Sequence, residues 1–148
     1  MIFRNQLYRN EPHNEIFGDC QRTVIACLLD LDPHAVPHFV QNQYTTPGYD
    51  WQDAMEAFLN ERGLTYTEIQ LTGEASLRDV LSTRISFPDH YYILAGMSPR
   101  GVNHVVIGCG DKIVWDPHPD ATGLIGPLNY GVWEMAFIQP ISMKRVFQ

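Results

Sequence analysis

Cys20 stands where a helix is predicted to begin. Asp19, directly before it, is a preferred N-cap residue, and Val24, Cys27 and Leu28 follow at helical spacing. A thiol in the first turn lies at the positive end of the helix dipole, which favours the thiolate, the reactive form of cysteine. The sequence therefore predicts a nucleophilic thiol at this position.

Two possible partners of this thiol lie far downstream. His104 begins the apolar run 104–108, and Asp116 ends the run 113–116, directly before Pro117. The glycine-containing segment between the runs predicts a hairpin with its turn near 110–111, so the two side chains should face each other on neighbouring strands. An aspartate there would fix the imidazole tautomer and leave the other ring nitrogen free to act on a thiol. Cysteine, histidine and aspartate in these places are the parts of a thiol hydrolase.

Each of these residues also has an ordinary structural explanation. Free cysteines are common in protein cores, and Cys27 is expected to have only that role, while Cys109 is expected to lie in a turn without a function. A zinc site formed by Cys20, Cys109, His104 and His118 is a further alternative. Their spacings match no compact metal motif, so neither a metal nor a cofactor is expected. The three residue types fall at independently predicted ends of elements, and this joint pattern favours catalysis.

The composition limits the classes of partner. The chain has 148 residues, of which 10 are basic and 17 acidic, for a net charge of −7 without a block of like charge. Such a surface repels phosphate backbones, so nucleic acid is not an expected partner. No membrane-spanning run, signal-peptide pattern or disulfide framework is evident, and we expect one cytoplasmic domain over residues 1–148. The expected partner is a peptide, protein or small amide substrate.

Helical patterns come before strand patterns along the chain. Helices are predicted over 20–31, 32–36, 51–59 and 76–83, with a loop over 37–49. Strands are predicted over 64–70, 91–96, 104–108 and 113–116, with closing strands over 135–138 and 141–147. Helices followed by an antiparallel sheet indicate an α+β fold in which the nucleophile helix packs on the sheet.

The site residues resemble those of the papain-like cysteine peptidase superfamily, and in particular its bacteriocin-processing peptidases, which remove double-glycine leaders. The matching pieces are Gly18-Asp19-Cys20 opening a helix, His104 opening a strand, and Asp116-Pro117 ending the next strand. They lie between Asn14 and Pro119, in the order that the superfamily uses. The resemblance implies a papain-like fold, with an N-terminal helical lobe, a C-terminal antiparallel sheet and the site between them.

The resemblance also implies roles for the residues. Cys20 would be the nucleophile, His104 the general base and Asp116 the residue that orients the histidine. The superfamily often places a glutamine several residues before the nucleophile, where it completes the oxyanion hole. Position 14 is an asparagine here, so Asn14 could donate this bond from a shorter side chain, and Gln6 is the alternative donor.

Three residues beside the predicted triad are candidates for binding a substrate. Arg100 in the turn before His104 could meet a carboxylate or phosphate, and Asn103 and His118 could line the cleft. Solvated surface side chains are the alternative interpretation. The expected reaction is hydrolysis of an amide, peptide or isopeptide bond through an acyl-thioester. Acyl transfer, deamidation, or a binding module without turnover on the same fold are the alternatives.

Overall fold

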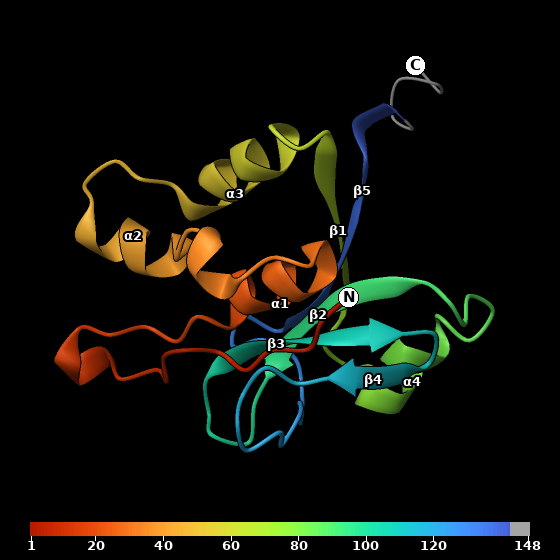
Figure 1. The fold of residues 1–148 in the computed structure, drawn as a ribbon. Helices are drawn as coiled ribbons and strands as arrows, with labels where there is room; N and C mark the ends of the chain where they lie inside the picture. The colour runs from red at the N-terminus through yellow and green to blue at the C-terminus, as the bar shows by residue number, and fades with distance from the viewer. Residues whose placement is uncertain (143–148) are drawn as a thin grey trace.

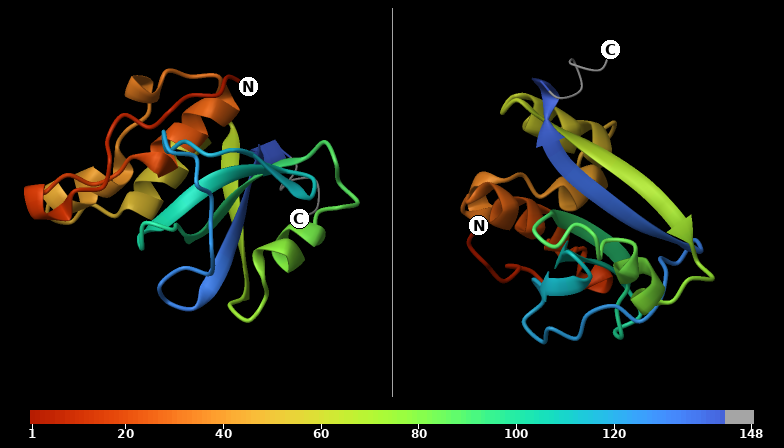
Figure 2. Two further views of the ribbon diagram at one scale, coloured as in Figure 1. Left: turned by 90° about the horizontal axis from the view of Figure 1, so that it is seen from below. Right: turned by 90° about the vertical axis from the view of Figure 1, so that its right-hand side faces the viewer.

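The computed structural model describes residues 1–142, which form an antiparallel sheet with helices on both faces (Figure 1). Its five strands run in the spatial order β1-β5-β2-β3-β4, and every neighbouring pair is antiparallel. The strands are β1 Leu64–Thr72, β2 Tyr91–Met97, β3 Asn103–Cys109, β4 Lys112–Trp115 and β5 Val132–Pro140. The long pair formed by β1 and β5 is seen most clearly in Figure 2.

Most of the helical structure comes before the sheet. The α-helices are α1 Cys20–Leu29, α2 Phe39–Thr45, α3 Trp51–Asn60 and α4 Leu77–Ser82, and the short 3-10 helices are η1 Pro12–Asn14 and η2 Pro33–Ala35. Figure 1 shows α1, α2 and α3 grouped together, with α4 apart from them. Val80 of α4 packs in a cluster with residues of β2, β3 and β5. The fold is therefore α+β, with helices packed on an antiparallel sheet as the sequence predicts.

Alternation along β3 divides the core into two clusters. Val105 and Ile107 belong to the cluster that contains Ile25 of α1, whereas Val106 belongs to the cluster that contains Val80 of α4 and Trp133 of β5. Successive side chains of a strand point to opposite faces, so one buried strand supports both layers. The strand that carries His104 is consequently held from both sides.

Helix α2 lies in the segment that the sequence predicts as a loop, and that prediction is wrong. Of its seven residues only Phe39 is buried, so the segment lacks an apolar stripe from which a helix could be recognised. The helix is instead started by its cap, because His38 accepts a hydrogen bond from the backbone N–H of Gln41. Packing of Phe39 against Phe58 of α3 completes its attachment.

The closing strand is longer and lies earlier than predicted. Strand β5 runs continuously over Val132–Pro140 and pairs along its whole length with β1. The second closing strand is predicted over 141–147. Residues 141–142 are not in a strand, and residues 143–147 lie outside the described part of the chain.

The hairpin of β3 and β4 has a two-residue turn. Cys109 pairs with Lys112, which leaves Gly110 and Asp111 between the strands, and Gly110 has a φ of +60°. Glycine suits this left-handed conformation because it has no Cβ. The predicted position of the turn is therefore confirmed.

None of the helices among residues 1–142 combines the length and apolar character that crossing a bilayer would need.

Gly108→Ala is expected to destabilise the sheet. Its cross-strand partner is Tyr92, whose buried ring occupies the space of an added Cβ and is anchored by a 2.7 Å hydrogen bond from its hydroxyl to the Gly110 carbonyl. Overpacking of this kind costs about 1–3 kcal/mol in free energy of unfolding, which urea denaturation would measure. Gly126→Ala is the control, because an added Cβ there meets no heavy atom of the described residues within 4 Å. Equal stability of the two variants would contradict the prediction.

Candidate active site

His104 and Asp116 form a buried hydrogen-bonded pair. Nε2 of His104 lies 2.7 Å from Oδ1 of Asp116, and the two residues are only 4% and 7% exposed. The carboxylate also accepts 2.8 Å hydrogen bonds from the backbone N–H groups of His118 and Gly123. Both carboxylate oxygens are thus engaged, and the loop after β4 folds around them. The expected histidine–aspartate bond is present.

A β-bulge brings the two side chains together. Gly108 pairs with Ile113, but Ile107 pairs with Trp115, so Val114 is an extra residue on β4. Asp116 follows Trp115 and therefore comes level with Val106. The two side chains face each other as predicted, although the residues are not opposite in the ladder: without the bulge Asp116 would be level with Val105, whose side chain points to the other face. His104 and Val106 point to the same side of the strand, so the aspartate reaches the histidine diagonally.

Cys20 begins α1, as predicted, and lies on the His104 side of the His104–Asp116 pair. Its side chain is partly exposed and lies within interaction range of the His104 ring, because the thiol is among the groups that raise the pKa of that imidazole. Because Nε2 of the ring faces Asp116, Nδ1 is the nitrogen available to the thiol. The structure therefore brings together all three predicted residues in the order thiol, imidazole, carboxylate.

The electrostatics of the group favour a charged imidazole. Burial disfavours the imidazolium, but the hydrogen bond with Asp116, the interaction with the Cys20 thiol, and the negative charges of both raise the pKa of His104 to about 9. Burial also acts against the charge of Asp116, yet the hydrogen bonds from His104 and from two backbone N–H groups hold the pKa of this carboxyl below its ordinary value. The pair is therefore an imidazolium and a carboxylate near neutral pH.

Asp19 occupies the N-cap position, as predicted, but its side chain has a different role. Among residues 1–142 the carboxylate makes no capping hydrogen bond with α1. It accepts hydrogen bonds from the backbone N–H groups of Leu7 at 3.2 Å and Tyr8 at 2.8 Å, and it pairs with Nε of Arg22 at 3.0 Å. The first turn of the helix that carries Cys20 is thus left without a side-chain cap.

Gln6 lies closer to the candidate site than Asn14 does. Its backbone N–H donates to the carbonyl of Pro117 at 2.8 Å, and its Nε2 reaches the space directly beside Gly18. One N–H of that amide donates to the Tyr8 carbonyl at 2.6 Å, which leaves the other for a ligand. Asn14 is exposed in η1, where its side chain donates to Glu11. Of the two predicted oxyanion donors, the structure favours Gln6.

Helix α2 supports the loop before Cys20, a role that no sequence pattern predicts. Gln41 accepts a 2.8 Å hydrogen bond from the backbone N–H of Phe17 and donates to the carbonyl of Glu15. The ring of His38 is 2.9 Å from the carbonyl of Phe17. These bonds hold the chain on its approach to α1.

The three predicted substrate-binding residues have different surroundings. His118 is buried, its ring centroid lies 6.2 Å from that of His104, and its Nδ1 accepts from the backbone N–H of Asp120. Burial, and then the charge of Arg100, lower the pKa of His118. Arg100 and Asn103 are exposed, and each bonds a neighbouring loop, Arg100 through Thr122 and Asn103 through the side chain and backbone of Asn129. His118 alone among them is packed against the triad.

Cys109, the fourth residue of the zinc alternative, lies apart from Cys20, His104 and His118. Cys109 lies at the far end of β3 from His104, where its thiol donates to the carbonyl of Pro88 at 3.2 Å. Within the described residues, no group of three or more histidine, cysteine or acidic side chains is arranged to hold a metal ion.

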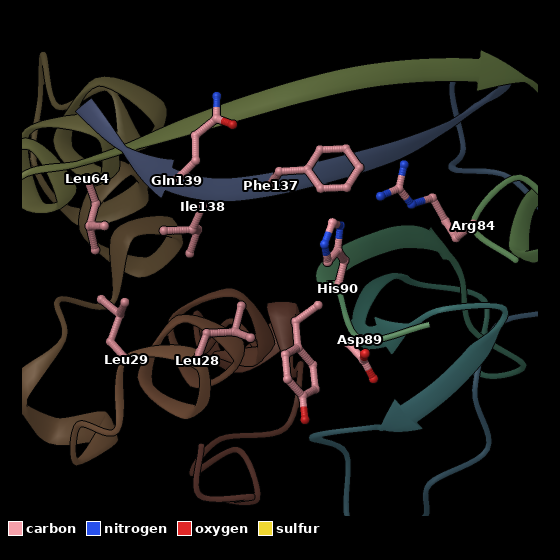
Figure 3. Close-up of a pocket in the computed structure, with 10 residues that line it drawn as sticks. Leu28, Leu29, Leu64, Arg84, Asp89, His90, Phe137, Ile138 and Gln139 are labelled. Carbon is pink, nitrogen blue, oxygen red and sulfur yellow. The ribbon is translucent and has the colours of Figure 1, made fainter. Parts of the chain in front are cut away.

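A hollow of about 670 Å³ lies at the opposite end of α1 from Cys20 (Figure 3). Leu28 and Leu29 of α1 form one wall, and Phe137, Ile138 and Gln139 of β5 form another. Eight or nine residues of helix separate this wall from Cys20, which is roughly 12 Å at 1.5 Å per residue. The hollow is therefore distinct from the candidate active site.

Comparisons with protein-family models, curated proteins and solved structures found no match to this chain. The chemistry of the site therefore rests on its own residues. Those residues are a partly exposed thiol at a helix start, an imidazole that contacts it, and a buried carboxylate behind the imidazole.

The proton on His104 should make stability depend on pH. Because its folded pKa of about 9 exceeds the unfolded value of about 6.5, the stabilisation is fully present below about pH 6.5 and is lost as the pH rises through about 9. Ring NMR should show this titration, and Asp116→Asn should move it to lower pH. The difference in free energy of unfolding between wild type and His104→Gln should decline over the same range. A wild-type imidazole that titrates near 6.5 would contradict the prediction.

Proposed function

We propose that this protein is a papain-like thiol hydrolase that cleaves an amide, peptide or isopeptide bond through an acyl-thioester on Cys20. The observation that carries the proposal is the His104–Asp116 hydrogen bond of 2.7 Å, buried and in contact with Cys20. A buried charged pair costs desolvation energy. A catalytic role, in which the imidazolium stabilises a thiolate, would explain why the protein contains such a pair.

Cys20 and His104 would act first as an ion pair. The imidazolium stabilises the thiolate, whose sulfur attacks the carbonyl carbon of the substrate and forms a C–S bond. The C–N bond then breaks, and Nδ1 of His104 gives its proton to the leaving amine. The products of this half-reaction are a free amine and an acyl-thioester on Cys20.

The negative charge on the carbonyl oxygen would be met by two kinds of donor. The backbone N–H groups at the start of α1 are free of a side-chain cap within residues 1–142, and the second N–H of the Gln6 amide is available beside Gly18. Donors aimed at a developing oxyanion lower the barrier because they need no reorganisation during the reaction.

Water would complete the cycle. The neutral imidazole left by the first step removes a proton from water, the hydroxide oxygen attacks the thioester carbonyl, and the C–S bond breaks to release a carboxylic acid. Asp116 holds the ring orientation in both steps through its bond to Nε2. An amine in place of water would make the same site an acyltransferase, and a glutamine side chain as substrate would make it a deamidase.

Cys20 is expected to be the thiol that reacts first. Limited treatment with iodoacetamide at mildly acidic pH, followed by peptide mapping, should place the first adduct on Cys20. Cys27 is fully buried, and burial raises the pKa of its thiol; burial and the charge of Asp89 raise the pKa of Cys109. Cys20→Ser should lose the rapid adduct while keeping its melting temperature. First labelling of Cys27 or Cys109 would contradict the nucleophile assignment.

Turnover of a panel of peptide, isopeptide and glutamine-amide substrates should rank the variants. Cys20→Ala abolishes turnover, His104→Ala lowers kcat/KM by about 10²-fold or more, and Asp116→Asn has an intermediate effect because the wrong tautomer is stabilised. Gln6→Glu, which removes the donor and keeps the shape, costs about 10²-fold, whereas Asn14→Ala is the matched control and stays active.

The same substrates should show a pH limit. Turnover by the wild type is expected to fall as the pH rises through about 9, because the imidazolium that protonates the leaving amine is lost.

Full activity in Cys20→Ala would end the proposal in favour of a different chemistry. A chain that binds these compounds without turning them over would be the binding module.

A further inference from the structure

We infer that Asp19 is a positioning residue. It holds the N-terminal arm, residues 3–8, between α1 and the end of β4, and thereby fixes the position of Cys20 relative to His104. The inference deepens the proposed function and rests on it. Its basis is the set of hydrogen bonds that the arm makes, on one side with α1 and on the other with the end of β4.

Asp19 anchors the arm directly beside the nucleophile. Its side chain is fully buried, and it accepts the backbone N–H groups of Leu7 and Tyr8 while pairing with Arg22. The Arg22 side chain also lies over the Tyr8 ring, 5.7 Å from its centroid, and donates to the carbonyl of Val36. The carboxylate next to Cys20 in the chain is thereby paired with a cation and bonded to the arm.

The arm is also bonded to the end of β4, through the residues on either side of Asp116. The indole N–H of Trp115 donates to the carbonyl of Arg4 at 2.8 Å, Phe3 stacks on the Trp115 ring with centroids 5.0 Å apart, and Gln6 donates to the carbonyl of Pro117. Trp115 and Pro117 are the two neighbours of Asp116 in the chain.

The other side of the arm returns to α1. The backbone N–H of Arg4 donates to Sγ of Cys27 at 3.3 Å, and Figure 1 shows the arm running between α1 and the β3–β4 hairpin. Apolar packing between helix and sheet is non-directional, whereas these hydrogen bonds set the position of one element relative to the other. The arm also carries Gln6, the favoured oxyanion donor.

The test measures the Cys20–His104 contact in Asp19→Ala and in the closer substitute Asp19→Asn. The first readout is the rate of iodoacetamide alkylation at Cys20, expected to fall about tenfold or more in Asp19→Ala because small displacements of reacting groups are costly. Asp19→Asn, which can still accept the shorter bond from Tyr8, should fall less. The second readout is the NMR titration of the His104 ring, expected to move to lower pH in the same order.

The titration separates positioning from general stability. The charges that contribute most to the raised pKa of His104 are those of Cys20 and Asp116, so a changed geometry in an Asp19 variant should alter the titration and the alkylation rate of Cys20 together. Asp50→Ala is the matched control, because Asp50 also accepts two backbone N–H bonds, from Gln52 and Asp53, at the start of α3. It should lower the melting temperature and leave the alkylation rate and the titration unchanged.

Each outcome decides one of the two proposals. If the wild type shows neither rapid alkylation of Cys20 nor a raised His104 titration, the proposed function fails. If the wild type shows both and the Asp19 variants change only the melting temperature, as Asp50→Ala does, the positioning role fails and the function stands. Faster turnover in folded Asp19→Asn would mean that the arm blocks the site, and would also overturn the positioning role. Should Asp19→Ala not fold, Asp19→Asn alone decides.

Discussion

The hydrogen bond between His104 and Asp116 is the interaction on which the rest of the site depends. Two ionisable groups with almost no exposure are stable together only if each satisfies the other and the remaining lone pairs find donors. The backbone N–H groups of His118 and Gly123 supply those donors, so the loop after β4 is shaped by the carboxylate that it encloses. The same bond orients the imidazole and helps to raise its pKa to about 9. The ring that faces Cys20 is therefore an imidazolium near neutral pH.

The bond in turn depends on one extra residue in an edge strand. Had the register of β4 continued without Val114 as an extra residue, Asp116 would have come level with Val105, whose side chain points away from that of His104. A bulge at a sheet edge is a usual way to redirect a side chain. Here the bulge turns the carboxylate of Asp116 to the face of the hairpin that carries His104. Asp116 is then level with Val106, two residues from His104 on the neighbouring strand.

The nucleophile helix is placed by two kinds of contact. Its buried side chains, among them Val24 and Ile25, hold it on the sheet through close packing. The residues near its first turn are held by polar bonds, from the arm to Asp19 and from helix α2 to Phe17. Apolar burial supplies the larger share of the stabilisation, whereas the polar bonds determine where the thiol stands.

The sequence alone determined the parts of this protein that follow from neighbouring residues. Helical spacing after Asp19 places Cys20 at a helix start, and two apolar runs around Gly110 form the hairpin that carries His104 and Asp116, because periodicity and turn chemistry act over a few residues. Only the tertiary structure decided the rest. The bulge at Val114 has no residue-type signal, α2 has one buried residue, and the partners of Asp19 and Gln6 lie up to 111 residues apart in sequence. Such contacts arise when packed elements bring distant backbone groups within reach, and a local pattern does not encode them.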